Sequence, residues 1–272
     1  MCAWLGVSRS GYYRWRDREP SVQSCRREHV RSAVVVAFKE FRQRYGAPRI
    51  TVELNEAGIA CSVNHIAKLM QEQGLKARNG KGYKYFPAPN AYSNLSGNLL
   101  NRDFRATGPD QKWVSDITYI KVARGHVYLA VIMDLFSRQI IGWAMGRNMT
   151  QSLIIQAFNM AVSRRKVKPG LILHSDRGVQ YRSREYTLAL VDAGITPSMS
   201  RKGNCWDNAV MESFFARLKV ESLHAEKLKG YPEAYSTVFE YIEVFYNRIR
   251  RHSALNYRSP VDFEREYLDK CA

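Results

Sequence analysis

Alternating apolar and polar residues predict a β-strand at residues 113–120 (WVSDITYI). Side chains of a strand point to its two faces in turn, so Asp116 shares a row with Val114, Thr118 and Ile120. A carboxylate in such a row costs several kcal/mol unless a cation or hydrogen bonds compensate for it. The pattern therefore marks Asp116 as a residue kept for its chemistry.

The same reading predicts alternating strands and helices between residues 109 and 225. Apolar runs predict strands at residues 126–136, 139–144, 171–173 and 195–199, and helical spacing predicts helices at residues 150–165, 183–193 and from 207 onward. Three neighbouring strands followed by alternating helices and strands predict an α/β fold, with a mixed sheet flanked by helices.

Two more acids stand at the ends of predicted elements. Asp176 follows the apolar run 171–173 just before a turn at Gly178, and Glu212 lies near the start of a helix for which Asp207 is the expected N-cap. Mg²⁺ binds a few carboxylates together with waters and phosphate oxygens, and two such ions about 4 Å apart stabilise an in-line displacement at phosphorus. Each acid taken singly also fits a cap or an ion-pair partner.

The segments around these acids resemble the three catalytic blocks of bacterial insertion-sequence transposases of the OrfB type. These are relatives of retroviral integrases with a D,D-35-E core, and 35 residues separate Asp176 from Glu212 here. The segment 246–255 (YNRIRRHSAL) resembles the C-terminal signature of that family. The blocks are residues 113–120, 174–181 and 204–215.

The resemblance implies a ribonuclease H-like catalytic core in which Asp116, Asp176 and Glu212 bind two Mg²⁺ ions, with Mn²⁺ able to substitute. It implies 3′-end cleavage and strand transfer on double-stranded DNA, at element ends and target, by at least a dimer. Two other functions stay open: a ribonuclease H-like nuclease that cuts without joining, and a non-catalytic DNA-binding regulator. Metal dependence and joining assays separate them.

Two basic residues accompany the acids. Lys219 follows Glu212 by seven residues, which on a helix leaves the two about 20° apart and points Lys219 toward a phosphate at the site. The family resemblance implies a basic residue there too, and a solvated lysine is the alternative. Arg177 is expected to tune the carboxylates or to bind DNA, whereas His174 fits a packed strand-end residue better than a general base.

Residues 1–76 predict an all-helical, helix-turn-helix-like region. Ser62 is an expected N-cap and Gly74 an expected stop, with Val63, Ile66, Leu69 and Met70 on the apolar face. The alternative is a small helical domain with a solvated polar face. The expected DNA contacts of this region are Arg49, Asn64, His65 and Lys68.

Residues 5–15 resemble the end of a second such motif without its first helix. This suggests that the chain is one reading frame of a larger product, with the upstream reading-frame product as an expected partner. Two Cys–His pairs, Cys25 with His29 and Cys61 with His65, allow a zinc alternative, but their order differs from the integrase zinc module.

Residues 77–108 read as a linker rich in Gly, Pro and Asn, and residues 226–272 as a helical basic tail. Helical spacing of apolar and aromatic residues over 231–255 fits a core better than a DNA surface. The polar end of that stretch supplies further expected DNA contacts, with a solvated basic run as the alternative. These contacts are Arg248, Arg250, Arg251 and His252.

Composition supports a partner that carries phosphate. The chain has 42 Lys and Arg against 25 Asp and Glu, a net charge of +17. The sequence contains no run of about 18 apolar residues, the length that would predict a membrane span. Five dispersed cysteines fit reduced thiols, so we expect a cytoplasmic, nucleoid-associated bacterial protein with no membrane partner.

Overall fold

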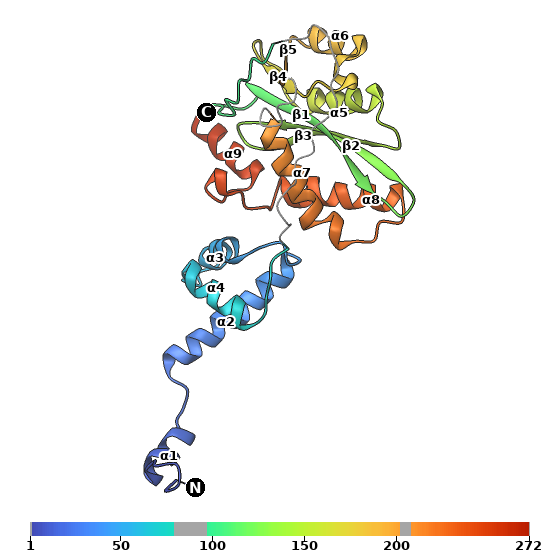
Figure 1. The fold of residues 1–272 in the computed structure, drawn as a ribbon. Helices are drawn as coiled ribbons and strands as arrows, with labels where there is room; N and C mark the ends of the chain where they lie inside the picture. Colours follow the sequence, from blue (N-terminus) through green and yellow to red (C-terminus); the bar gives the residue numbers. More distant parts are fainter. Residues whose placement is uncertain (1, 79–96, 202–207, 272) are drawn as a thin grey trace. The chain divides into compact units, whose positions relative to one another are not determined.

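The computed structural model describes residues 2–78, 97–201 and 208–271 (Figure 1). The chain divides into two compact units, Met1–Arg78 and Asn79–Ala272. We call them the N-terminal unit and the C-terminal unit, and each is described by itself. Asp207 and most of the predicted linker lie outside the described residues. The described end of that linker, residues 97–108, includes the buried Leu100.

The N-terminal unit is all-helical, with a small core in which Val34, Tyr45, Ile50 and Ile66 are fully or almost fully buried. Its helices are α1 (Arg9–Arg16), α2 (Val22–Glu40), α3 (Ala47–Glu56) and α4 (Val63–Glu72). None of the residues of α1 is buried, so this helix contributes nothing to that core.

The predicted start of α4 is confirmed. The Ser62 hydroxyl accepts a hydrogen bond from the His65 amide at 3.3 Å, which satisfies one of the open N–H groups of the first turn. Ile66, Leu69 and Met70 are buried as expected. Val63 was expected on the same apolar face but, as the first residue of the helix, is 43% exposed.

The C-terminal unit contains one five-stranded mixed sheet in the order β3-β2-β1-β4-β5. β1 pairs with β2 and β2 with β3 in antiparallel fashion, whereas β1 pairs with β4 and β4 with β5 in parallel. The predicted mixed sheet is thus confirmed, with β1 at its centre. The strands are β1 (Lys112–Lys121), β2 (His126–Asp134), β3 (Ile140–Gly146), β4 (Ile172–Ser175) and β5 (Thr196–Met199).

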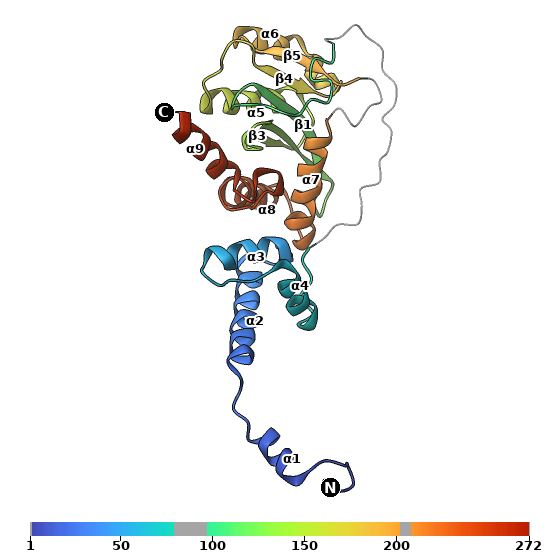
Figure 2. The same ribbon diagram turned by 90° about the vertical axis from the view of Figure 1, so that its left-hand side faces the viewer.

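Helices cover both faces of this sheet (Figures 1 and 2). α5 (Gln151–Arg164) and α6 (Arg184–Asp192) pack on one face, together with the short η1 turn (Val179–Arg182). α5 lies very close to β3, since a Cβ at Gly142 would stand 2.2 Å from the Ala157 carbonyl oxygen. The opposite face carries α7 (Ala209–Glu221) and α8 (Tyr231–Phe239).

The C-terminal region differs from the single helix expected over residues 231–255. After α8 the chain widens into a π-helix, η4 (Glu240–Tyr246), and then leaves helical geometry before η5 (Ser253–Leu255). Asn247 fixes this departure, because its side-chain amide makes two 2.9 Å hydrogen bonds to the backbone of Ile140 in β3. The chain ends in α9 (Pro260–Cys271), which the apolar spacing did not indicate as a separate helix.

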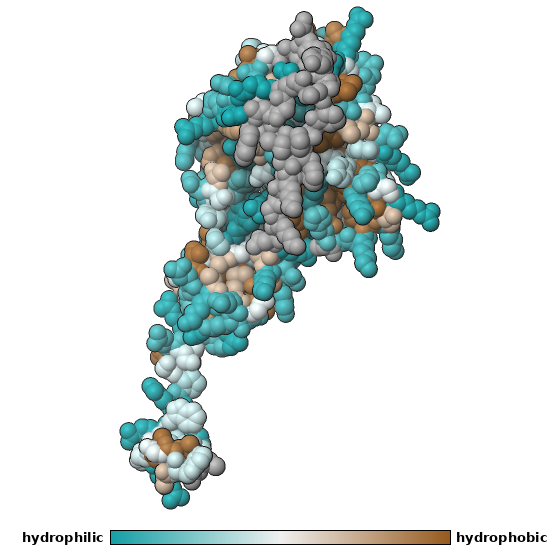
Figure 3. Space-filling model, in the orientation of Figure 1, coloured by the Kyte–Doolittle hydropathy of each residue, from teal (hydrophilic) through white to brown (hydrophobic). Residues whose placement is uncertain are grey.

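Hydrophilic side chains cover most of the described surface in the view of Figure 3. Within the described residues, no helix is both long enough and apolar enough to cross a membrane.

Candidate active site

Strand register places the two aspartates side by side. Lys112 pairs with Ile172 and Val114 with His174, a constant offset of 60 residues that also relates Asp116 to Asp176. β4 ends at Ser175, so Asp176 stands at its carboxyl end while β1 continues past it. The two carboxylates therefore meet where one edge of β1 becomes free of its parallel neighbour.

One oxygen of each aspartate is held by the backbone. Oδ1 of Asp116 accepts from the Ile117 amide at 2.8 Å, and Oδ1 of Asp176 accepts from the Gly178 amide at 2.8 Å. Among the described residues, the second oxygen of each carboxylate has no hydrogen-bond partner. These bonds orient the side chains and leave one oxygen of each open to a ligand.

Glu212 reaches the site from α7, which packs against β1. The first turn of α7 is tied to β1 by Asn208, whose Nδ2 donates to the carbonyl oxygen of Ser115 at 3.3 Å. Asn208, not Asp207, is the residue that precedes this helix, and its side chain makes no capping bond. This hydrogen bond attaches the start of α7 to Ser115, the residue that precedes Asp116 in β1.

Asp176 and Glu212 are close enough for their charges to act on Asp116. The pKa of Asp116 is raised well above its ordinary value, first by desolvation and then by the charges of Asp176 and Glu212. Desolvation also raises the pKa of Asp176 and of Glu212. Crowded carboxylates of this kind gain most from a cation placed between them.

The residues fit a divalent cation bound together with substrate. Among the described residues, no three carboxylate, imidazole or thiolate groups converge closely enough to hold an ion by themselves. Mg²⁺ does not require such a cage, since one or two carboxylates suffice when waters and phosphate oxygens complete the shell. The charges of Asp176 and of Glu212 both act on Asp116, so Asp116 with Asp176 and Asp116 with Glu212 are the two pairs available.

Lys219 belongs to the same site. Its Nζ lies 4.9 Å from the centre of the Tyr119 ring, and the charge of Asp116 acts on it. Desolvation lowers the pKa of Lys219, and that charge partly offsets the effect. Tyr119 is 58% exposed. Sequence reasoning missed Tyr119; its period-2 position in β1 was visible, but nothing indicated its contact with Lys219.

Two buried polar contacts lie near the acids, and only the second involves a residue that the sequence predicted to be packed. The hydroxyls of Ser115 and Tyr181 share a 2.9 Å hydrogen bond, which joins β1 to the η1 turn that follows Asp176. His174 is fully buried between Ser198 and Ser200, at 2.8 Å and 3.0 Å, as expected for a packed strand-end residue. The alternation of β1 predicted that Ser115 points away from Asp116, but its partner could not be predicted.

Arg177 points back into the fold. Its Nε donates to the carbonyl oxygen of Ser200 at 2.6 Å, and its side chain is half-buried. The contact anchors the turn that carries Asp176. Neither of the two expected roles, tuning of the carboxylates or DNA contact, is tested by this geometry.

The predicted DNA contacts of the N-terminal unit fall on α3 and α4. Asn64 and Lys68 are exposed on α4, and His65 is half-buried beside them. Arg49 lies in α3 with its guanidinium 5.5 Å from the centre of the Tyr45 ring. Asn64 and Lys68 are therefore accessible to a large ligand.

The four C-terminal candidates have different environments. Arg248 is exposed, and Arg251 donates to the carbonyl oxygen of Tyr257 at 3.3 Å. His252 stacks edge-on against Tyr246. Arg250 is 3% exposed and bonded to Glu221 through two nitrogens, at 2.6 Å and 2.7 Å, so its burial withholds it from DNA and gives it a structural role.

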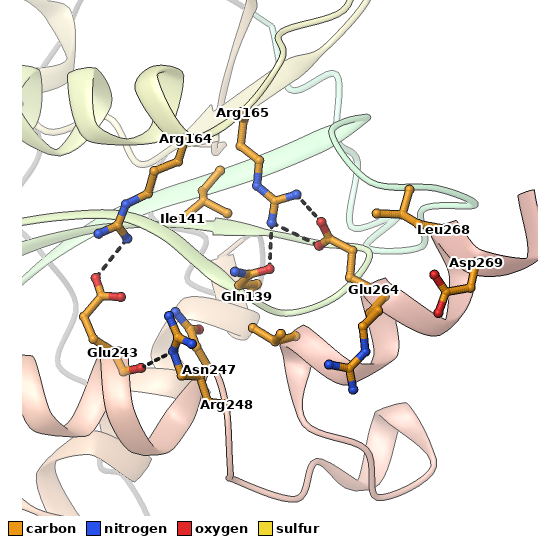
Figure 4. Close-up of a pocket in the computed structure, with 12 residues that line it drawn as sticks. Gln139, Ile141, Arg164, Arg165, Glu243, Asn247, Arg248, Glu264, Leu268 and Asp269 are labelled. Carbon is orange, nitrogen blue, oxygen red and sulfur yellow. Dashed lines mark hydrogen bonds and ion pairs between the residues drawn. The ribbon is translucent and has the colours of Figure 1, made fainter. Parts of the chain in front are cut away.

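A separate cavity of about 600 Å³ lies between β3, α5, η4 and α9 (Figure 4). Its arginines face carboxylates: Arg164 pairs with Glu243 at 2.9 Å, and Arg165 pairs with Glu264. Arg165 also donates to Gln139 at 2.7 Å. These balanced pairs join the end of α5 to η4 and to α9. None of the three candidate catalytic acids lines the cavity.

Sequence models of known families match both units. The Integrase core domain matches residues 106–205, a second Integrase core domain model matches residues 193–260, and the HTH-like domain matches residues 26–82. The first two span all three acids, and the third spans α3 and α4.

The chain is 44% identical to Transposase InsF for insertion sequence IS3A of Escherichia coli K12, covering 98% of this chain and 94% of that protein. It is 42% identical, over the whole of both chains, to the insertion element IS600 31 kDa protein of Shigella sonnei. Its fold resembles a chain of the simian T-cell lymphotropic virus intasome, with a TM-score of 0.50 at 15% identity over 85% of this chain and 73% of that one.

Proposed function

Because the chain belongs to the insertion-sequence transposases of the IS3 (InsF) family, with an integrase core that makes it a DDE polynucleotidyl transferase, we propose that it cleaves 3′ ends of its element and joins them to target DNA. The observation that carries the proposal is the register that sets Asp116 beside Asp176 at the free edge of β1, with Glu212 near enough for its charge to act on Asp116. The ribonuclease H-like sheet positions them, and the N-terminal unit supplies a DNA-binding helix-turn-helix.

Asp116, Asp176 and Glu212 would hold two Mg²⁺ ions, with Mn²⁺ able to substitute. Bound there, the ions would stabilise both the attacking and the leaving oxygen of an in-line displacement at phosphorus. Asp116 would contribute to both ions, which the action of the Asp176 and Glu212 charges on it supports. No side chain need form a covalent bond to DNA.

The remaining residues of the site would hold the catalytic acids in place and orient the substrate. The Ile117 and Gly178 amides keep the two aspartate side chains in one rotamer, and the Ser115–Tyr181 bond keeps β1 and the Asp176 turn at a fixed separation. Lys219, supported by the Tyr119 ring, would bind the phosphate next to the reacting one. Fixing that phosphate contributes to rate because small displacements of reacting groups are costly.

Recognition of the element ends would use α4, with Asn64, His65 and Lys68 toward DNA and Arg49 on the supporting helix. Arg177, Arg248, Arg251 and His252 are further proposed contacts. Transposition must handle two element ends together, so we propose that the protein acts as at least a dimer. We also propose that it acts with the upstream reading-frame product.

A joining assay tests this function. Duplex carrying the element end, with a labelled 3′ strand, is incubated with the protein, plasmid and Mg²⁺. We expect labelled strand linked covalently to the plasmid, and no product when Mg²⁺ is removed by EDTA. Cut ends without linked product would instead support a nuclease, and DNA binding with no metal-dependent product would support a regulator.

A further inference from the structure

A second cavity lies on the flank of α7 that faces away from Glu212. We call it the α7 pocket. Its volume is about 270 Å³, close to the lower end of the range for sites that bind small molecules. Its lining comes from α7, from the turn between β2 and β3, and from the segment after η4. The residues that matter below are Arg138, Arg217, Ser213, Phe214 and Tyr246.

The charge of the α7 pocket is one-sided. Arg138, Arg217, Arg250 and His252 line it, and among the residues that the structure describes no aspartate or glutamate does. The charge of Arg250 is balanced by Glu221 beneath the pocket floor. Arg217 is exposed and has no carboxylate partner among the described residues. The cavity of Figure 4 differs in this respect, because acids that line it pair with its arginines.

Arg138 is the unusual member of this set. Its Nη1 is buried without a hydrogen-bond partner in the described part of the chain. Desolvation lowers the pKa of its guanidinium, an effect that the negative charge of Asp134 opposes. An unsatisfied buried N–H of a charged group costs more than an ordinary lost hydrogen bond, so its retention needs a reason.

The surrounding fold keeps Arg138 in that state. Its φ is 59°, the left-handed region that a side chain other than glycine rarely adopts. Asp134, whose charge acts on Arg138, already accepts hydrogen bonds from the Asp110, Phe136 and Ser137 amides at 2.7–3.1 Å. The turn therefore presents a guanidinium to the pocket and directs the carboxylate elsewhere.

Other features of the α7 pocket favour an anion that carries a less polar group. Ala209 and Val210 line it, and these residues form the first turn of α7, where a helix has positive partial charge and open N–H groups. Ser213 offers a hydroxyl, while the buried rings of Phe214 and Tyr246 form an apolar floor. Guanidinium groups bind phosphate oxygens strongly and with defined geometry.

We propose that the α7 pocket binds a phosphate group of a nucleotide, with Arg138 and Arg217 as its ligands. The proposal rests on the proposed function in one respect: the nucleotide would belong to the DNA that the protein processes. Ser213 directly follows Glu212 in α7, so a phosphate bound here would fix the rotation of the helix that carries a catalytic acid. The pocket would add a DNA contact outside the catalytic acids.

The test compares Arg138→Met and Arg217→Gln with a matched loss of charge, Arg184→Gln, on α6 at the opposite face of the sheet. Affinity of the full chain for end duplex is measured in EDTA over a range of salt concentrations. Each pocket variant should weaken binding about tenfold at low salt and reduce the slope of log K against log salt by about 0.9, with Arg184→Gln unchanged.

Thermal unfolding provides a second readout. Arg138→Met removes a half-buried charge whose Nη1 has no hydrogen-bond partner among the described residues, so the melting temperature should stay the same or rise. Sodium phosphate and dAMP, compared with sodium chloride at equal ionic strength, should raise the melting temperature of the wild type and leave that of Arg138→Met unchanged.

These readouts distinguish the sources of the phosphate. Protection by phosphate and dAMP together with an unchanged DNA salt slope would identify a free nucleotide as the ligand and keep the subsite. A clear drop in the melting temperature of Arg138→Met would show that Arg138 holds the fold, and would overturn the proposal. The proposal would also be overturned if both pocket variants kept the wild-type salt slope and phosphate did not raise the melting temperature of the wild type. It would be overturned too if Arg184→Gln weakened DNA binding as much as the pocket variants do. A wild type that binds no DNA would contradict the proposed function instead.

Discussion

At the scale of single residues, the contact with Tyr119 positions the ammonium group of Lys219. The centre of the Tyr119 ring lies 4.9 Å from its Nζ, and the charge of Asp116 also acts on it. The side chain is half-buried, so its hydration is reduced and its interaction with a phosphate is stronger than that of a surface lysine. A phosphate contact carries no base information, which decides what its loss should do.

Lys219→Ala should reduce the slope of log K against log salt by about 0.9 and weaken binding to different end sequences about equally. Strand transfer should fall more than affinity, because the phosphate loses its position as well as a charge. Lys219→Arg should keep most of the affinity. Lys166→Ala, which removes an exposed lysine after α5, serves as the control. An unchanged slope with wild-type strand transfer would return Lys219 to an ordinary surface lysine.

At the scale of elements, a buried ion pair joins the end of α7 to the segment after η4. Arg250 and Glu221 are 3% and 1% exposed, and the Tyr241 hydroxyl donates to Glu221 at 2.8 Å. The strong hydrogen bonds keep Arg250 charged by raising its pKa against the effect of burial. Removing one partner leaves the other charge buried and unpaired, which is far more costly than removing both.

Glu221→Ala or Arg250→Ala should therefore lower the free energy of unfolding of the C-terminal unit by about 3–5 kcal/mol. Arg248→Ala, a nearby exposed arginine, should change it by no more than about 0.5 kcal/mol. Replacing both partners by apolar residues, Glu221→Leu with Arg250→Met, should recover much of the loss. Chemical denaturation measures all four; single variants as stable as Arg248→Ala would contradict a structural role for the pair.

Element types in the core could be predicted because each has a clear period or a long apolar run. The π-helix η4 could not, since the same aromatic spacing fits an α-helix until the side chain of Asn247 binds Ile140, 107 residues away in sequence. The burial of Arg250 has a similar origin: its partner Glu221 lies in α7, and a run of arginines looks alike whether solvated or paired. Burial at a helix end is also hard to predict: the helical pattern placed Val63 on the apolar face, but this first residue of α4 is exposed.

At the scale of the whole molecule, the three acids could be predicted from three short motifs, but their arrangement depends on chain pairing. The register that sets Asp116 beside Asp176 follows from β1 and β4 lying next to each other in parallel, which no local pattern reveals. The Ser115–Tyr181 bond and the α7 pocket join segments that lie far apart in sequence. Predicting them needs the packed structure.

The separate cores of the two units suggest that each can be studied alone. A fragment of residues 1–78 should bind DNA without cutting it, and residues 97–272 should nick DNA in a metal-dependent way with poor sequence selectivity. The second fragment should start at residue 97, because the Leu99 and Leu100 amides donate to the Ser198 hydroxyl. Electrophoretic mobility shifts at low salt measure DNA binding by the fragment of residues 1–78. If that fragment has no affinity for DNA, the helix-turn-helix assignment is contradicted.

The most direct test of the account is the joining activity of three isosteric variants, Asp116→Asn, Asp176→Asn and Glu212→Gln, assayed with Mg²⁺ and with Mn²⁺. Each substitution removes a metal-binding charge but no DNA-binding cation, so affinity for end duplex should stay close to that of the wild type. We predict that all three lose cleavage and strand transfer with Mg²⁺. Substantial strand transfer by any one of them with Mg²⁺ would contradict the assignment of these three acids as the catalytic site.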